Sequence, residues 1–190
     1  MALELKRGCE ACDQTDVAMT MLNLAGMRRG VDGAGDAEAA SALYEESLEI
    51  SEANGRLEEA KVALVNIHNM HEFELKHMEF DDVGPNFAPT ADGSPNEVVE
   101  LQMASYTKAA TARRRIRQIA TQLGRSDADA EDCPICLEKL KGDAAPVLSA
   151  DGKPPPHATR MVVLPCLHIM HMECFAKSAR DKCPCCNLPV

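Results

Sequence analysis

Eight cysteine and histidine residues in the last third of the chain have the types and the spacing that bind zinc. A Cys-x2-Cys pair stands at each end, and a Cys-x-His-x2-His-x2-Cys quartet lies between them. Thiolate sulfur and neutral imidazole nitrogen are the ligands that Zn²⁺ prefers, and four of them close a tetrahedral structural site. Two such pairs around a quartet are a strong signal for metal binding. The eight residues are Cys133, Cys136, Cys166, His168, His171, Cys174, Cys183 and Cys186.

The composition indicates a soluble protein of the cell interior. The chain has 190 residues, which suits one or two small domains. Seven of its nine cysteines lie between residues 133 and 186 together with histidine, which favours metal in a reducing compartment over disulfides. The first residues lack an apolar signal core, and no stretch approaches the roughly 18 apolar residues of a membrane span. We therefore expect no membrane span and a cytoplasmic location, with the nucleus as the alternative.

The net charge of −10 is distributed unevenly. Residues 1–97 carry 7 basic and 20 acidic side chains, whereas residues 98–125 carry 6 basic and 1 acidic side chain. An acidic N-terminal half speaks against nucleic acid as a partner, because phosphate binding needs concentrated Lys and Arg. The basic run from Arg113 to Arg117 fits nucleic-acid binding or an import signal. Pairing with the acidic preceding helices is the role we favour for this run.

The first 125 residues read as helical. Apolar residues recur at steps of three and four between residues 17 and 67, and the breaks fall at residues 30–35 and at Asn54-Gly55. Helices of roughly 15–18 residues with short turns between them pack as antiparallel hairpins. Residues 81–96 form a Pro- and Gly-containing loop, and residues 97–124 form one long helix. We place the helical region at 1–125, a linker at 126–132 and the zinc module at 133–190.

Part of the helical region resembles a tetratricopeptide repeat. The likeness lies in residues 35–67, with Gly35-Asp36 opening a helix, the small Ala39, Tyr44 and the Leu48–Ile50 run. Solenoid repeats of this kind usually need about three units to bury a continuous core. A generic helical bundle is the alternative. The resemblance implies that this region binds a protein substrate or partner.

The segments CPICLEKL (133–140), LPCLHIMHMECF (164–175) and CPCC (183–186) together resemble a RING finger of the two-histidine variety. The resemblance implies a small α+β module with two structural zinc ions, in which alternating ligand pairs share an ion. The fold class is thus mainly α, with helical hairpins followed by this finger. Cys185 stands as a spare thiol, with replacement of Cys186 as the alternative. One ion would be held by Cys133, Cys136, His171 and Cys174, and the other by Cys166, His168, Cys183 and Cys186.

The same resemblance implies a RING-type E3 ubiquitin-protein ligase. Such a finger docks a ubiquitin-conjugating enzyme that carries ubiquitin, and it promotes transfer to a substrate by positioning. It supplies no catalytic nucleophile of its own and needs no cofactor besides zinc. The docking groove of the family is apolar, and its matching positions are Ile135, Leu137, Phe175 and Pro184.

Two departures from the family pattern support a second hypothesis, a non-catalytic zinc-binding adaptor. Many two-histidine fingers carry Trp where this chain has Ser178. Many active members carry Arg just after the last ligand, where this chain has Asn187. A neutral amide lacks the forked, charged donor set of a guanidinium.

A further group of cysteines and histidines lies in the helical region. Cys9 and Cys12 form another Cys-x2-Cys pair, and His68, His71 and His77 are candidate companions. Buried helical cysteine usually behaves as a small apolar residue. We expect packing roles here, with metal or redox chemistry as the alternative.

Overall fold

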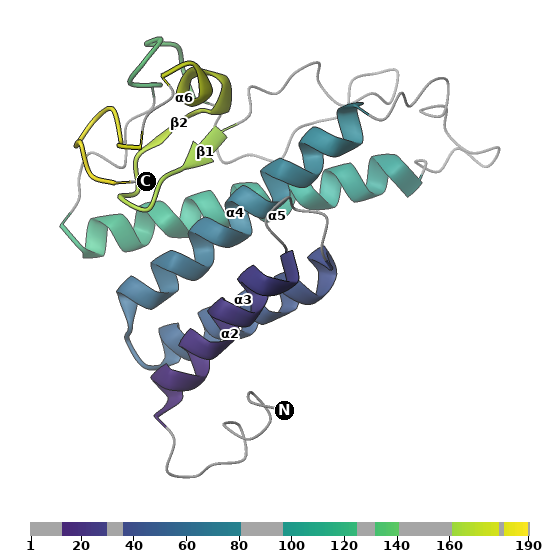
Figure 1. The fold of residues 1–190 in the computed structure, drawn as a ribbon, viewed down its shortest axis with the longest axis vertical. Coiled ribbons are helices and arrows are strands. Elements are labelled where there is room, and N and C mark those ends of the chain that lie inside the picture. Colours follow the sequence, from purple (N-terminus) through teal and green to yellow (C-terminus); the bar gives the residue numbers. More distant parts are fainter. Residues whose placement is uncertain are drawn as a thin grey trace.

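The structure is a computed structural model that describes residues 13–29, 36–80, 97–124, 132–140, 161–178 and 181–189. It is mainly helical, as the periodic apolar residues predict, with one two-stranded sheet in the described part (Figure 1). The predicted loop at 81–96 and most of the predicted linker lie outside the described residues. The elements are α2 (Gln14–Arg29), α3 (Ala37–Ala53), α4 (Leu57–Phe80), α5 (Glu97–Gln122), β1 (Met161–Val163), β2 (Ile169–His171) and α6 (Met172–Ser178).

Helix α3 begins and ends where the sequence predicts. The Asp36 carboxylate accepts a hydrogen bond from the Ala39 N–H at 2.9 Å, which satisfies a donor that the helix leaves free. At the other end Gly55 takes a left-handed conformation, with φ at 66°. The Arg56 N–H then donates to the Ser51 carbonyl at 2.8 Å, which closes the helix end. The chain reverses there and continues as α4, so α3 and α4 form an antiparallel hairpin.

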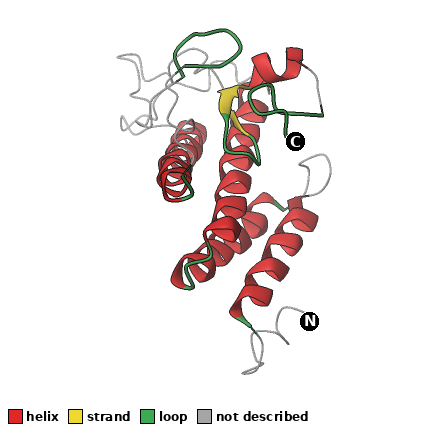
Figure 2. Cartoon of the chain, turned by 90° about the vertical axis from the view of Figure 1, so that its left-hand side faces the viewer, coloured by secondary structure: helices red, strands yellow, loops and turns green. Residues whose placement is uncertain are grey.

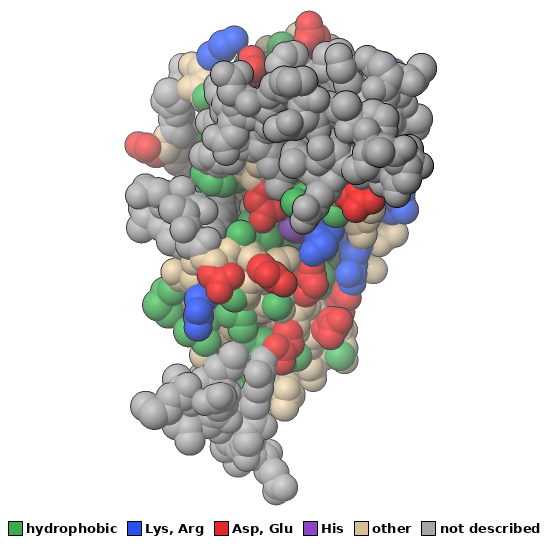
Figure 3. Space-filling view, turned by 90° about the vertical axis from the view of Figure 1, so that its right-hand side faces the viewer, with side chains coloured by type: hydrophobic (Ala, Val, Ile, Leu, Met, Phe, Trp, Pro, Cys, Tyr) green, Lys and Arg blue, Asp and Glu red, His purple; other side chains and the backbone are tan. Residues whose placement is uncertain are grey.

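The helices pack in chain order, with α2 on α3, α3 on α4 and α4 on α5 (Figure 2). Two ion pairs join α3 to α5 at a constant separation of 63 residues, Glu45 with Lys108 and Glu52 with Arg115. A constant separation means that α3 and α5 run in the same direction on either side of α4. Figure 3 shows acidic and basic side chains close together on one face of this region. A cavity of about 220 Å³ lies between α3, α4 and α5.

The core of the helical region is built largely from alanine and medium-sized aliphatic side chains, as the scarcity of aromatic residues requires. Ala25, Ala40, Ala60 and Ala63 are each fully buried, which lets the helices approach closely. The periodic apolar pattern does not separate buried from exposed positions completely, because Met27 is exposed. Within the described residues, none of the helices combines the length and apolarity that crossing a bilayer requires.

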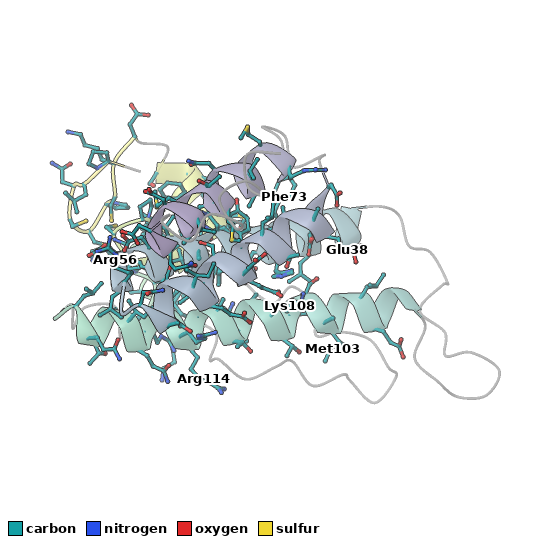
Figure 4. All side chains as sticks on the ribbon, turned by 90° about the horizontal axis from the view of Figure 1, so that it is seen from below. Glu38, Arg56, Phe73, Met103, Lys108 and Arg114 are labelled. Atoms are coloured by element: carbon teal, nitrogen blue, oxygen red, sulfur yellow. The ribbon has the colours of Figure 1, made fainter. Side chains whose placement is uncertain are left out.

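The Arg run at 113–117 is only partly a solvated face. Arg113 is 5% exposed, and its Nη1 donates to Glu72 Oε1 at 2.9 Å, while Arg115 pairs with Glu52. Arg114 is exposed and points away from the other helices (Figure 4). The expected pairing with the preceding helices is therefore present at Arg113 and Arg115.

The C-terminal module that carries the predicted metal ligands lies against the helical region. Strand β1 contacts α4, and both Figure 1 and Figure 2 place the two-stranded sheet beside that helix. One continuous apolar cluster runs from Ile67 and Met70 of α4 to Val163 and Leu164 of the module. The two parts of the chain thus share a core.

Candidate metal centre

The first Cys-x2-Cys pair is held in a tight turn by its own backbone. The Leu137 N–H donates to the Cys133 carbonyl at 2.9 Å, and the Cys133 N–H donates to the Glu138 carbonyl at 2.8 Å. Leu137 closes the turn in the left-handed region, with φ at 61°. This turn aims the sulfurs of Cys133 and Cys136 at one point.

The second Cys-x2-Cys pair repeats the turn. The Asn187 N–H donates to the Cys183 carbonyl at 2.9 Å, and the Cys183 N–H donates to the Leu188 carbonyl at 2.8 Å. Asn187 has φ at 59°. Asparagine is among the few residues that adopt this conformation readily, which gives a backbone reason for Asn187. Leu137 occupies the equivalent position without that advantage.

The quartet lies on a β-hairpin that continues into a helix. The Leu167 N–H donates to the Leu164 carbonyl at 2.8 Å, and Leu167 has φ at 72°. This turn places Cys166 and His168 beside each other at the hairpin tip. His171 ends β2 and Cys174 lies in the first turn of α6. The two ligand pairs of the quartet therefore point to opposite ends of the hairpin.

These elements bring the eight predicted ligands into two groups of four. Within each group the ligand atoms lie within 4.8 Å of one another. The groups are the interleaved sets that the resemblance implies, and Cys186 rather than Cys185 belongs to the second. They are Cys133, Cys136, His171 and Cys174 in the first, and Cys166, His168, Cys183 and Cys186 in the second.

The distances between donor atoms fit one zinc ion in each group. Ligand bonds of the usual zinc lengths at tetrahedral angles put sulfur and nitrogen about 3.6 Å apart. Both histidines present Nδ1 to the sulfurs, and the distances fall on either side of that value. His171 Nδ1 lies 3.2 Å from the Cys136 sulfur and 3.9 Å from the Cys174 sulfur. His168 Nδ1 lies 3.3 Å from the Cys166 sulfur and 3.5 Å from the Cys183 sulfur.

The protonation of the thiols is consistent with such a site. Burial, together with neighbouring thiols, raises the pKa of Cys166 and of Cys174 to about 12 in the absence of an ion. Burial also opposes ionisation of Cys133, but backbone N–H groups outweigh it and lower the pKa of that thiol. Zinc must therefore displace protons to bind, so its affinity rises with pH. With four protein donors each, the sites leave no open position for an activated water.

The predicted docking residues differ in exposure. Leu137 is 77% exposed, and Ile135 on the same turn is exposed as well. Pro184 is exposed on the second turn. Phe175 is half-buried and packs against the module's core. Sequence reasoning missed Leu188, an exposed large apolar residue that is recognisable as the second residue after the last ligand.

Ser178 lies at the end of α6, and its hydroxyl donates to the Phe175 carbonyl at 2.7 Å. Helix α6 has only seven residues. Ser178 therefore satisfies a carbonyl in the last turn of α6.

The other predicted cysteines and histidines form no third group among the described residues, where only the two sets above meet the geometry for a metal. Cys9 and Cys12 lie outside the described residues, as does the side chain of His77. His71 Nδ1 lies 2.8 Å from Glu74 Oε2, and His68 is fully buried beside Arg113.

No protein-family model matches this sequence, and neither the curated proteins nor the solved structures include a match for it.

Proposed function

We propose that the protein is a RING-type E3 ubiquitin-protein ligase, with a helical region that binds the substrate. The observation that carries the proposal is the pairing of the ligands in two interleaved groups. Interleaving ties the three ligand-bearing segments of this small module together. Structural zinc contributes on the order of 10–16 kcal/mol of apparent binding energy per ion, which is enough to order such a module.

The proposed reaction needs positioning rather than a nucleophile. A conjugating enzyme that carries ubiquitin as a thioester would dock on the apolar residues of the two turns, Ile135 and Leu137 on one and Pro184 on the other. The amine of a substrate lysine attacks the thioester carbonyl and forms an amide bond. The carbon–sulfur bond breaks, and the conjugating enzyme's sulfur leaves and takes up a proton as the free thiol. Holding the reactants in a reactive arrangement lowers the barrier without chemistry from this chain.

Leu137 supports the docking role because its exposure and its backbone conformation both cost free energy in a protein without a bound partner. It exposes most of a large apolar side chain and adopts a left-handed backbone conformation. That conformation costs a non-glycine residue on the order of 1–2 kcal/mol. Strained residues and exposed apolar side chains concentrate where proteins contact partners.

The test is discharge of ubiquitin from a panel of charged conjugating enzymes by the zinc-loaded full chain. We expect faster discharge with at least one enzyme and loss of that stimulation in Leu137→Ala. Leu101→Ala is the matched control, because Leu101 is 53% exposed but lies on α5. No stimulation with any enzyme, or equal effects of the two variants, would reject the proposal.

Asn187 favours the second candidate function, a non-catalytic adaptor that binds partners through the same module. Its neutral amide cannot donate the charged, forked bonds of arginine. Asn187→Arg separates the two functions. A ligase should discharge ubiquitin faster with this variant, whereas an adaptor should bind a conjugating enzyme without discharge in either form.

A further inference from the structure

Asn69 on α4 forms two hydrogen bonds with the backbone of the zinc module. Its Nδ2 donates to the Val163 carbonyl at 2.9 Å, and the Val163 N–H donates to its Oδ1 at 3.1 Å. The two residues are 94 positions apart in the sequence. A side-chain amide has the same donor and acceptor as a peptide group. Asn69 therefore satisfies both backbone groups of Val163 at once.

The bonds lie on the free edge of the sheet. The Leu164 N–H donates to the His168 carbonyl across the hairpin at 3.0 Å. Because bonding alternates along an antiparallel strand, the backbone groups of Val163 face away from β2. Asn69 thus takes the place that a third strand would take. Val163 is three residues before Cys166, and its strand pairs with the strand that ends at His171.

A buried network fixes the orientation of Asn69. Arg113 Nη1 lies 3.1 Å from His68 Nε2, and His68 Nδ1 lies 3.2 Å from Asn69 Oδ1. Arginine can only donate, so Nε2 accepts and the proton of the neutral imidazole is on Nδ1, which donates to Asn69. Arg113 is in turn held by Glu72 at 2.9 Å. Each hydrogen bond in this network thus pairs a donor with an acceptor, from Arg113 of α5 through His68 and Asn69 of α4 to Val163 of β1.

We propose that Asn69 is a positioning residue, which holds the zinc module in one orientation on the helical region. Apolar contact between α4 and β1 alone allows the module to slide or rotate, because such packing is non-directional. Two directed hydrogen bonds at a strand edge prevent this sliding and rotation. We call the pair of hydrogen bonds between Asn69 and Val163 the clamp. One consequence of the clamp rests on the proposed ligase function: by fixing the orientation of the module, the clamp determines which lysines the transferred ubiquitin reaches.

Amide hydrogen exchange of the zinc-loaded full chain tests the clamp. In Asn69→Leu, the segment 161–164 should exchange about tenfold faster or more, because both bonds to Val163 are lost. Asn69→Asp keeps an acceptor for the Val163 N–H and should give an intermediate rate. Asn66→Leu is the matched control on the same helix and should exchange like the wild type. Zinc content and helix content are measured beside each rate.

Unchanged exchange of this segment in both Asn69 variants would overturn the proposal. If Asn69→Leu loses zinc or helix content, the exchange rate of segment 161–164 in Asn69→Asp is used instead, and an unchanged rate would overturn the proposal. In the ligase assay, both variants should discharge ubiquitin to free lysine at the wild-type rate. The distribution of ubiquitin on the chain's own exposed lysines, Lys108 of α5 and Lys177 of the module, should differ from that of the wild type. Absence of discharge in the wild type would reject the ligase function and leave the exchange test intact.

Discussion

Replacing Arg113 should destabilise the helical region far more than replacing the arginine beside it. Arg113 is 5% exposed and Glu72 is 3% exposed, so their ion pair is shielded from water. Arg113→Met leaves the Glu72 carboxylate buried without its cationic partner. It also leaves His68 Nε2 without the donor that lies 3.1 Å from it. The free energy of unfolding should therefore fall sharply.

The size of the effect follows from the burial of the pair. Removing one member of a buried ion pair costs about 3–5 kcal/mol, because the other charge stays in a medium of low polarity. For a chain of 190 residues, a loss of about 3 kcal/mol lowers the melting temperature by roughly 6–12 °C. Replacing both partners with apolar residues is often close to neutral. The double variant Arg113→Met/Glu72→Leu should therefore recover most of the loss.

The assay is urea unfolding of the zinc-loaded protein, followed by the helical circular dichroism signal. Arg114→Met is the matched control, since Arg114 points away from the other helices (Figure 4), and it should change the unfolding free energy by less than about 0.5 kcal/mol. Equal effects of Arg113→Met and Arg114→Met would show that the buried ion pair does not stabilise the fold. A double variant no more stable than Arg113→Met would show that the unpaired Glu72 carboxylate is not the source of the loss.

Three further outcomes follow from single residues. Burial, and then Arg113, lowers the pKa of His68 to about 3. Between about pH 6.5 and pH 3 the unfolded chain therefore binds more protons than the folded chain, and stability decreases as the pH is lowered, by up to about 1.4 kcal/mol per pH unit. Urea unfolding at pH 7 and pH 5 should show a smaller loss in His68→Gln than in the wild type, and an equal loss would refute this. Leu137→Gly removes about 1–2 kcal/mol of left-handed strain and adds about 0.5–1 kcal/mol of lost chain flexibility, a net gain of about 0.7 kcal/mol. The folded, zinc-loaded protein should therefore withstand about threefold more chelator while ubiquitin discharge is lost, and weaker zinc retention would contradict this. Ser47→Ala removes the 3.0 Å bond from α3 to the Ala18 carbonyl of α2 and should cost about 1 kcal/mol in urea unfolding, whereas no change would show that the bond contributes nothing.

Local signals predicted much of the secondary structure. The periodic apolar residues and the Asn54-Gly55 break give the helices of 37–80, and the long helix predicted at 97–124 is α5 (Glu97–Gln122). The spacing of the ligands also predicted the residues of the metal centre, because that spacing too reflects local structure. Each Cys-x2-Cys turn is closed by its own backbone, so the sequence alone determines where its sulfurs point.

Contacts between distant segments left no such signal. The bonds between Asn69 and Val163 span 94 residues, and a single asparagine on a helix carries no mark of its partner. Pairing of the basic run with the preceding helices was expected, but nothing in the run distinguishes Arg113, which is buried against Glu72 and His68, from its neighbours. The left-handed backbone at Leu137 was also missed, because leucine does not favour it.

The central claim, two interleaved four-ligand sites, is tested most directly by counting zinc ions per chain with native mass spectrometry. We predict two ions in the wild type and in Cys185→Ser, and weakened or lost binding at one site in Cys136→Ser and at the other in Cys186→Ser. One ion or none in a chain with intact helices would contradict the account. So would loss of zinc in Cys185→Ser with full retention in Cys186→Ser, because the second site would then use the wrong thiol.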